Sequence, residues 1–322
     1  MPGYNHYMES PLKKAPTVSA YAKYYEDYNT SVLSGITSST KKPLSFDLYP
    51  LGYDKREVQY SSNVGESVWQ PTRWQSEGID PYYLVTMLTV ANKAKEQGNI
   101  FSYYIQAQTN KTQLKTTDKR ALVSSKEISM QLYAGMACGA KMYGYYLYNA
   151  LSTEPENGMI DANGNQTNLY GWVQSANNEA LPFADVLQTF TWEGAEFFSG
   201  QSDKNSEAKT LVDGNDSTLN LVLDNESDGV LNGVSSATDD ILVGYYKKGK
   251  QDAYMLANFN DPEQVTTENK VTLNFGNCNY ARVYTGTANG LKSEILKLKG
   301  GSCTFNLQPG GGCFVIPVKA AS

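Results

Sequence analysis

The sequence predicts an α/β region followed by an all-β region. Within residues 1–198, short apolar runs alternate with longer amphipathic segments, whereas from about residue 200 many short apolar runs are separated by Gly, Asn and Asp. The chain has 322 residues, of which 40% are hydrophobic and 12% aromatic. That length and composition suit two folded domains of roughly 150 residues each. We therefore predict one domain at 1–198 and a second at 199–322.

The first region is predicted to alternate helices with strands. Prolines bound the apolar run at 44–49, since proline cannot donate to an interior strand ladder. Apolar residues spaced by three and four predict a helix from Asp80 to Gly98. Strands that alternate with helices indicate crossover connections and a parallel sheet, here with apolar and aromatic side chains on both faces. The expected order is helix 17–34, strand 44–49, helix 80–98, strand 100–106, helix 124–139, strand 141–148 and helix 179–198.

The second region shows no helical pattern. Its short apolar runs lie close together with turn residues between them, which indicates an antiparallel β-sandwich. The expected strands are 219–223, 241–246, 253–259, 270–275, 281–284, 294–298, 303–307 and 313–318.

Composition and motifs exclude several classes of function. The net charge is -6 and no basic run occurs, which argues against a nucleic-acid partner. No apolar stretch approaches about 18 residues, so no membrane-spanning segment is predicted. No GxGxxG, GxxxxGK[ST], CxxC or HExxH motif is present, and His6 is the single histidine, so we predict no cofactor and no metal. Residues 161–165 resemble part of a calcium loop but lack its later glutamate, which favours a polar turn.

Two features concern the compartment. The N-terminus has no basic segment followed by an apolar one, so no export signal is visible, although abundant Asn, Ser, Thr, Gly and Tyr favour an extracellular or cell-surface protein. Four cysteines are too few for a disulfide scaffold. Cys303 and Cys313 flank a turn at 308–310, so a cross-strand disulfide and a pair of buried free thiols are both open alternatives.

Candidate ligand-binding residues lie at the ends of the predicted parallel strands and in the loops beyond. In a barrel of parallel strands, functional side chains come from the carboxyl ends of the strands. Aromatic faces suit the CH surfaces of a sugar, and carboxylate or amide groups suit its hydroxyls. Asp47 is favoured as functional, because a carboxylate in an apolar strand needs a partner or a purpose, whereas Tyr103 and Tyr143 are interpreted as core. The candidates are Asp47, Tyr49, Trp69, Trp74, Gln106, Gln108, Tyr146, Tyr148, Asn149 and Trp172.

Several segments resemble bacterial glycoside hydrolases of the (β/α)8-barrel clan that contains the family 42-type β-galactosidases and their uncharacterised secreted relatives. Three of them look like the later strands of that barrel, one like the link into its last helix and two like its C-terminal β-domain. The resemblance implies a partial TIM-type barrel, strands six to eight, followed by a β-sandwich. It is carried by 44–51, 100–108, 127–150, 158–180, 240–262 and 305–318.

The chain departs from this family at the residues that perform catalysis. A full barrel has eight strands, and glycoside hydrolysis uses two carboxyl groups. In the family, the acid/base glutamate follows the fourth strand, upstream of any residue present here. At the position of the nucleophilic glutamate on the seventh strand, this chain has Gln106, which leaves Asp47 as the carboxylate at a strand end. We therefore expect a product incomplete for catalysis alone: a truncated gene product, a piece of a longer protein, or a barrel completed by another polypeptide.

The first functional hypothesis is a glycoside-hydrolase-like protein that acts on or binds an oligosaccharide or polysaccharide. Asp47 would hydrogen-bond sugar hydroxyls or stabilise charge, Gln106 would orient the ring, and Trp69 and Trp172 would stack on it. The alternative is a non-catalytic carbohydrate-binding or assembly module that needs a partner chain, and a third is a structural remnant without a ligand. Open barrel edges also predict self-association.

Overall fold

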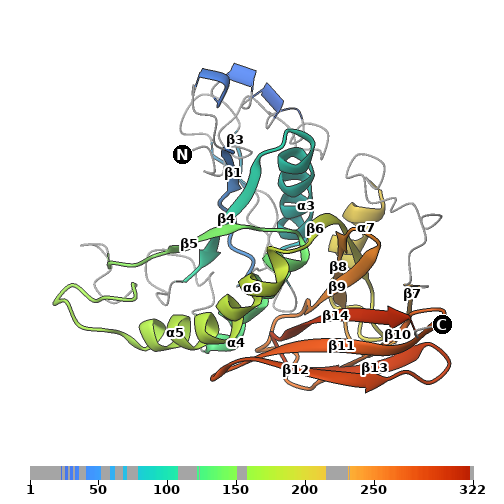
Figure 1. Cartoon of the computed structure of the whole chain (residues 1–322). Coiled ribbons are helices and arrows are strands. Elements are labelled where there is room, and N and C mark those ends of the chain that lie inside the picture. Colours follow the sequence, from blue (N-terminus) through green and yellow to red (C-terminus); the bar gives the residue numbers. More distant parts are fainter. Residues whose placement is uncertain are drawn as a thin grey trace.

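The chain forms a mixed α/β structure with one parallel sheet and antiparallel sheets (Figure 1). The predicted strand at 219–223 lies outside the residues that the structure describes. None of the described helices is long and apolar enough to cross a membrane. The structure is a computed structural model, and it describes residues 23, 26–27, 30–31, 33–35, 41–51, 59–61, 68–70, 79–107, 122, 124–150, 158–214, 231 and 233–319.

The parallel sheet consists of β1 (Pro43–Phe46), β4 (Ile100–Gln106) and β5 (Met142–Tyr146), in the order β1-β4-β5. Helix α3 (Pro81–Glu96) connects the first two strands and α4 (Ser125–Ala137) the last two. These elements confirm the predicted helix–strand alternation and its parallel pairing. A small antiparallel hairpin, β2 (Gln59–Ser61) with β3 (Val68–Gln70), lies in the segment predicted as a loop. At the N-terminus, the described residues of the predicted helix 17–34 are helical and end in the 3-10 turn η1 (Leu33–Gly35).

The two faces of the parallel sheet carry different side chains. Successive residues of a strand point to opposite faces. On one face Phe46, Phe101 and Tyr103 are buried and stacked, and the Tyr103 hydroxyl donates to the Gln131 carbonyl of α4 at 2.8 Å. The alternate positions hold Ser45, Ser102, Tyr104 and Gln106. The prediction of apolar and aromatic side chains on both faces is therefore confirmed only in part: tyrosine rings lie on both faces, whereas the leucine and phenylalanine side chains of these strands lie on the helix side.

Helix α4 lies between the parallel sheet and the six-stranded antiparallel sheet (Figure 1). Toward the parallel sheet, a Cβ atom on Gly135 would fall 2.2 Å from the Tyr103 hydroxyl. Toward the antiparallel sheet, a Cβ on Gly244 would fall 2.1 Å from the Ala137 carbonyl oxygen, and the Trp192 indole donates to that same oxygen at 2.9 Å. Close backbone approach on both sides explains why the helix is buried along most of its length.

The C-terminal part contains two antiparallel sheets, in the orders β12-β11-β14-β9-β8-β6 and β13-β10-β7. Side chains from both sheets form one hydrophobic cluster, which includes Val243, Val271, Phe305 and Val315. The seven strands predicted after residue 240 are all present. The strands are β6 (Thr191–Phe198), β7 (Gly233–Ala237), β8 (Ile241–Lys248), β9 (Gln251–Asn258), β10 (Asn269–Asn274), β11 (Cys278–Thr287), β12 (Gly290–Lys297), β13 (Ser302–Leu307) and β14 (Gly312–Lys319).

Two predictions around residue 198 are wrong. The segment 179–198 is not one helix: α5 (Asn168–Ala180) ends before Pro182, and η3 (Leu181–Phe183) and α6 (Ala184–Leu187) precede β6. Proline lacks the amide hydrogen that a continuing helix needs, and β6 obtains its hydrogen bonds from β8. The second region also contains a helix, α7 (Ser206–Asp213).

The four cysteines are free thiols. Cys303 lies on β13 and Cys313 on β14, and these two strands belong to different sheets. Of the two alternatives left open by the sequence, the cross-strand disulfide is therefore wrong. The turn between the two cysteines connects two different sheets, whereas a hairpin turn would connect two paired strands. Burial raises the pKa of both thiols.

Candidate functional site

The structure brings together side chains that follow the ends of β1, β4 and β5. Register places Gln106 opposite Tyr146, on the strand face opposite to that of Tyr103. Asp47 and Tyr49 follow the end of β1, and both are half-buried. The Tyr49 and Tyr146 rings are stacked, with centroids 5.5 Å apart and an interplanar angle of 27°. The carboxyl edge of the sheet thus brings together two aromatic rings, one of them two residues after Asp47 in the sequence.

Gln106 is fully buried and holds the segment that follows β1. Its side-chain oxygen accepts a hydrogen bond from the Leu51 amide at 2.9 Å, and its side-chain nitrogen donates to the Leu51 carbonyl at 3.3 Å. Its backbone is held in the same way by the Gln131 amide group on α4. Gln106 therefore fixes the backbone that carries Asp47 and Tyr49.

Tyr104 extends the aromatic surface on the same strand face. It lies opposite Gly144 of β5, and a Cβ atom on Gly144 would fall 2.9 Å from its ring. The half-exposed ring is therefore placed over a glycine, where no side chain can displace it. Sequence reasoning missed Tyr104, although a glycine within a strand is a signal of close approach by a neighbouring group.

The segment after β5 begins with a cis peptide bond between Tyr146 and Leu147. Tyr148 is 55% exposed, and its carbonyl accepts the Ile160 amide at 2.9 Å. The residues that follow form the predicted polar turn, in which an Asp161 oxygen accepts the amides of Asn163 and Asn165, both at 2.8 Å. These backbone and side-chain hydrogen bonds lower the pKa of Asp161, the bond from Asn165 contributing most.

The remaining candidates are not part of this cluster. Trp172 lies in α5, half-buried against the hydrophobic core, so its predicted loop position is wrong. Trp69 lies in β3, but its side chain, like the whole of Trp74 and Gln108, is outside the described residues. Asn149 is exposed and forms an isolated parallel bridge with Ile160.

The interpretation of Tyr103 and Tyr143 as core residues is confirmed. Tyr103 is 1% exposed, and Tyr143 is half-buried against the same hydrophobic cluster. The hydroxyls of Tyr143 and Tyr145 both reach the Asn177 side-chain oxygen, at 3.3 and 2.6 Å. These two of the three tyrosines of β5 thus attach α5 to the sheet.

Among the described carboxylates near this edge, two are engaged in local structure. Glu127 is fully buried in the first turn of α4, where it accepts the Ser124 amide at 2.9 Å in a capping box. Asp161 binds the amides of its own turn. Asp47, the third, follows the end of β1 and also interacts with other groups of the chain. A carboxylate beside flat aromatic rings suits a ligand with hydroxyl groups and a CH face.

Comparisons with known proteins give structural similarity without sequence similarity. No protein-family model matches the sequence, and the search of curated proteins found no match. A glycoside hydrolase of family 5 from Bacteroides vulgatus aligns with 97% of this chain and 70% of its own length, at 8% identity and a TM-score of 0.45. A second structure, described as "Glycoside hydrolase", aligns with 97% of this chain and 72% of its own length, at 12% identity and a TM-score of 0.45.

A third similar structure is a family 27 β-L-arabinopyranosidase from Geobacillus stearothermophilus, at 9% identity and a TM-score of 0.35 over 95% of this chain and 62% of its own. Structural neighbours of the chain are thus glycoside hydrolases of several families. The families printed for these structures, 5 and 27, do not include family 42, and the resemblance to that family stays a prediction. At these values the similarity alone assigns no activity to the chain.

Proposed function

We propose that the chain binds carbohydrate at the carboxyl edge of its parallel sheet. The observation that carries this proposal is the stacked Tyr49–Tyr146 pair beside the half-buried Asp47. Aromatic rings favour the CH face of a pyranose, and a carboxylate accepts hydrogen bonds from its hydroxyls. The ligand is an oligosaccharide or polysaccharide segment, bound as in a glycoside-hydrolase-like protein.

In this proposal each residue has a separate role. Asp47 accepts hydrogen bonds from sugar hydroxyls. The rings of Tyr49, Tyr146 and Tyr148 provide the surface against which the sugar packs. Gln106 is a positioning residue, since its amide group already binds the Leu51 backbone. Trp69, Trp74 and Gln108 are retained as ligand candidates on the sequence argument alone.

We further propose that β1, β4 and β5 correspond to the last three strands of a (β/α) barrel and that the two antiparallel sheets form a β-sandwich. The parallel strand order and the helices between the strands support the first part. The cluster of apolar side chains shared by the two sheets supports the second. The division at residue 198 remains a proposal. The core cluster on the α/β side also includes Phe314, from the C-terminal part.

Titration calorimetry of the full chain against a panel of neutral oligosaccharides tests the binding proposal. We expect measurable heat with at least one sugar and about tenfold weaker binding after Asp47→Ala, the loss of about 1.4 kcal/mol that one hydrogen bond to a charged group accounts for. Asp185→Asn, at an exposed position on α6, is the control and should bind normally. No heat with any sugar, or equal binding by the Asp47 variant, would refute the proposal.

A second candidate function is a non-catalytic carbohydrate-binding or assembly module. The observation that favours it is that Asp47 is the one candidate carboxylate among the described residues at this edge, whereas glycoside hydrolysis uses two. A hydrolysis assay with nitrophenyl glycosides separates the two candidates. Turnover by the isolated chain, lost in Asp47→Asn, would establish a hydrolase and exclude a module that only binds.

Self-association through the sheet edges is proposed as well. Within the described residues, β1 and β5 are the outer strands of the parallel sheet, and unpaired strand edges accept further strands. Light scattering after size exclusion measures the mass directly. A 35.5 kDa species at all concentrations would contradict self-association.

A further inference from the structure

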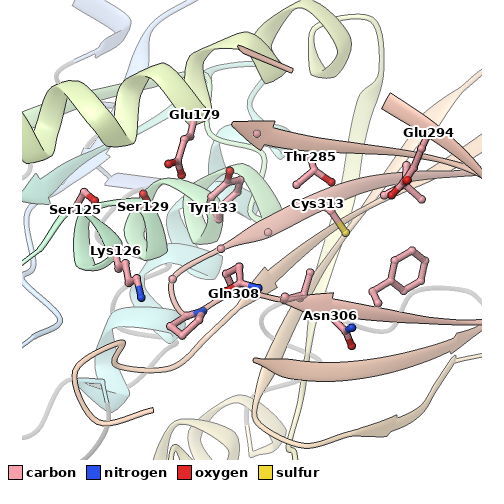
Figure 2. A pocket seen from close by; sticks show the side chains of 18 of the residues that line it. Ser125, Lys126, Ser129, Tyr133, Glu179, Thr285, Glu294, Asn306, Gln308 and Cys313 are labelled. Atoms are coloured by element: carbon pink, nitrogen blue, oxygen red, sulfur yellow. The ribbon is translucent and has the colours of Figure 1, made fainter. Parts of the chain in front are cut away.

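A cavity of about 620 Å³ lies between α4, the end of α5 and the strands β11 to β14 (Figure 2). Its volume falls within the range of roughly 300–1,000 Å³ that small-molecule sites occupy. It is separate from the carboxyl edge of the parallel sheet, because its helical wall consists of α4 residues such as Ser129 and Tyr133, while Gln131 on the same helix contacts Gln106.

One wall of the cavity holds two polar side chains that make no hydrogen bond to the residues the structure describes. Tyr133 is 2% exposed and lines the cavity, yet no hydrogen bond joins its hydroxyl to another described residue. Glu179 projects from α5 toward it (Figure 2), and its half-buried carboxylate likewise has no hydrogen bond or ion pair within the described part of the chain. A buried hydroxyl and a carboxylate of this kind need partners from a ligand or from solvent.

The ionisation of this pair is set by burial. Desolvation, followed by the negative charge of Glu179, raises the pKa of Tyr133 well above its ordinary value, so the phenol keeps its proton. Desolvation also raises the pKa of Glu179. The wall therefore offers a protonated phenol next to a carboxyl group that can accept hydrogen bonds.

Glycine positions keep this wall in place. A Cβ atom on Gly286 of β11 would fall 2.6 Å from the Tyr133 hydroxyl and 2.3 Å from the Glu179 carbonyl oxygen. A Cβ on Gly312 of β14 would fall 2.7 Å from the Tyr133 ring. The strands can approach α4 and α5 this closely only because these residues have no side chain.

The rest of the lining combines an apolar surface with polar groups, among them the charged side chain of Lys126 on α4 (Figure 2). Phe305 and Leu296 contribute apolar side chains, and Asn306 and Thr285 contribute an amide and a hydroxyl. Glu294 adds a second carboxylate, which lies beside Cys313 in Figure 2. Apolar surface bordered by carboxylates, amides and hydroxyls is the combination that suits a neutral polyhydroxylated ligand.

We propose that this cavity is a second saccharide-binding site, at which Tyr133 and Glu179 hydrogen-bond the hydroxyls of a short sugar segment. The ligand class rests on the function proposed above. The two sites use different residues and lie on different elements, so variants can separate them.

The test is isothermal titration of the full chain with lactose, cellobiose and xylobiose, using Tyr133→Phe and Glu179→Gln. Both substitutions keep the size of the side chain and remove one hydrogen-bonding function, and circular dichroism verifies that each variant is folded. We expect two binding events in the wild-type chain, one of them about tenfold weaker in each variant, or about 1.4 kcal/mol. Tyr280→Phe and Glu193→Gln, on other surfaces, are matched controls that should leave both events unchanged.

The outcomes distinguish this inference from the function proposed above. Sugar binding that Asp47→Ala removes and the cavity variants leave intact would overturn the second site while supporting the first. Binding that only the cavity variants weaken would support the second site and overturn the first. Absence of binding to every sugar would overturn both.

Discussion

The two faces of the parallel sheet differ in the side chains they carry. The face toward the helices is made of buried, stacked rings, of which Phe46 contacts the rings of Tyr83, Phe101 and Tyr103 at centroid distances of 5.8 to 6.1 Å. The opposite face carries serine, glutamine and tyrosine and ends at Asp47. A parallel sheet covered on both faces by helices is apolar on both. The second face differs because it carries polar groups, of which Ser45, Ser102 and Gln106 are buried. Under the proposed function, stability and binding should respond separately to substitutions on the two faces.

The largest effect is expected on the helix side. Phe46→Ala should lower the free energy of unfolding by about 3–5 kcal/mol, because it leaves a cavity among stacked rings. Urea denaturation measures the loss. If the variant still folds at low temperature, its sugar affinity should remain close to that of the wild-type chain. A loss below about 1 kcal/mol would show that this face is not the tightly packed one.

Gln106→Leu should have the next largest effect and should act on both faces. Removing its amide group leaves the buried Leu51 amide and carbonyl without these partners, which costs about 1–3 kcal/mol. Because the same segment carries Asp47, sugar binding should weaken as well. Denaturation and calorimetry on one preparation measure both quantities, and Gln174→Leu, at an exposed position of α5, is the control. Unchanged stability would contradict the assigned positioning role.

Asp47→Asn should affect binding far more than stability. The half-buried carboxylate lies at the carboxyl edge of the sheet, so we expect about tenfold weaker sugar binding with a change in unfolding free energy below about 1 kcal/mol. Calorimetry and thermal denaturation test the two parts. A large loss of stability with intact binding would instead make Asp47 a structural carboxylate.

Asp240 provides the structural counterpart of Asp47. It is fully buried, and it accepts hydrogen bonds from the Gly200 amide at 2.8 Å and from the Asn205 amide and side chain at 2.9 and 3.0 Å. The Asn205 side-chain oxygen in turn accepts a hydrogen bond, 2.9 Å long, from the amide of Ile79, which lies just before α3. Asp240 therefore helps to join the C-terminal part to the α/β part.

Asp240 should also contribute to the pH dependence of the free energy of unfolding, with a smaller effect than the substitutions above. Burial raises its pKa above the ordinary value of 3.8, so the native state binds the proton more tightly than the unfolded state does. Its contribution to stability is therefore present below pH 3.8 and is lost as the pH rises through the native pKa. The difference between wild type and Asp240→Asn, from urea denaturation across this window, should fall with pH. A difference that rises with pH would contradict the account.

The predictability of the fold from sequence differs along the chain. The strands after residue 240 could be predicted because Gly and Asn turns separate short apolar runs, and α3 because Leu84, Met87, Leu88 and Ala91 share one helix face. Strand β6 could not, since its hydrogen-bond partner β8 lies some fifty residues further along the chain, at 241–248. Tertiary pairing decided its structure against a local helical pattern.

The candidate site was predictable only in part. Asp47, Tyr49 and Tyr146 follow from the rule that functional groups lie at the carboxyl ends of parallel strands. The burial of Gln106 could not be predicted, because it depends on where the Leu51 backbone returns to the sheet. Tyr133 and Glu179 carry no signal in the sequence, since the cavity they line exists only where α4 and α5 meet the antiparallel strands.

The most direct test of the central claim is a crystal structure of the chain with the tightest-binding oligosaccharide from the calorimetric panel. We predict a sugar ring against the Tyr49–Tyr146 pair with a hydroxyl on the Asp47 carboxylate. A sugar bound elsewhere, with that edge of the parallel sheet empty at saturating ligand, would contradict the claim.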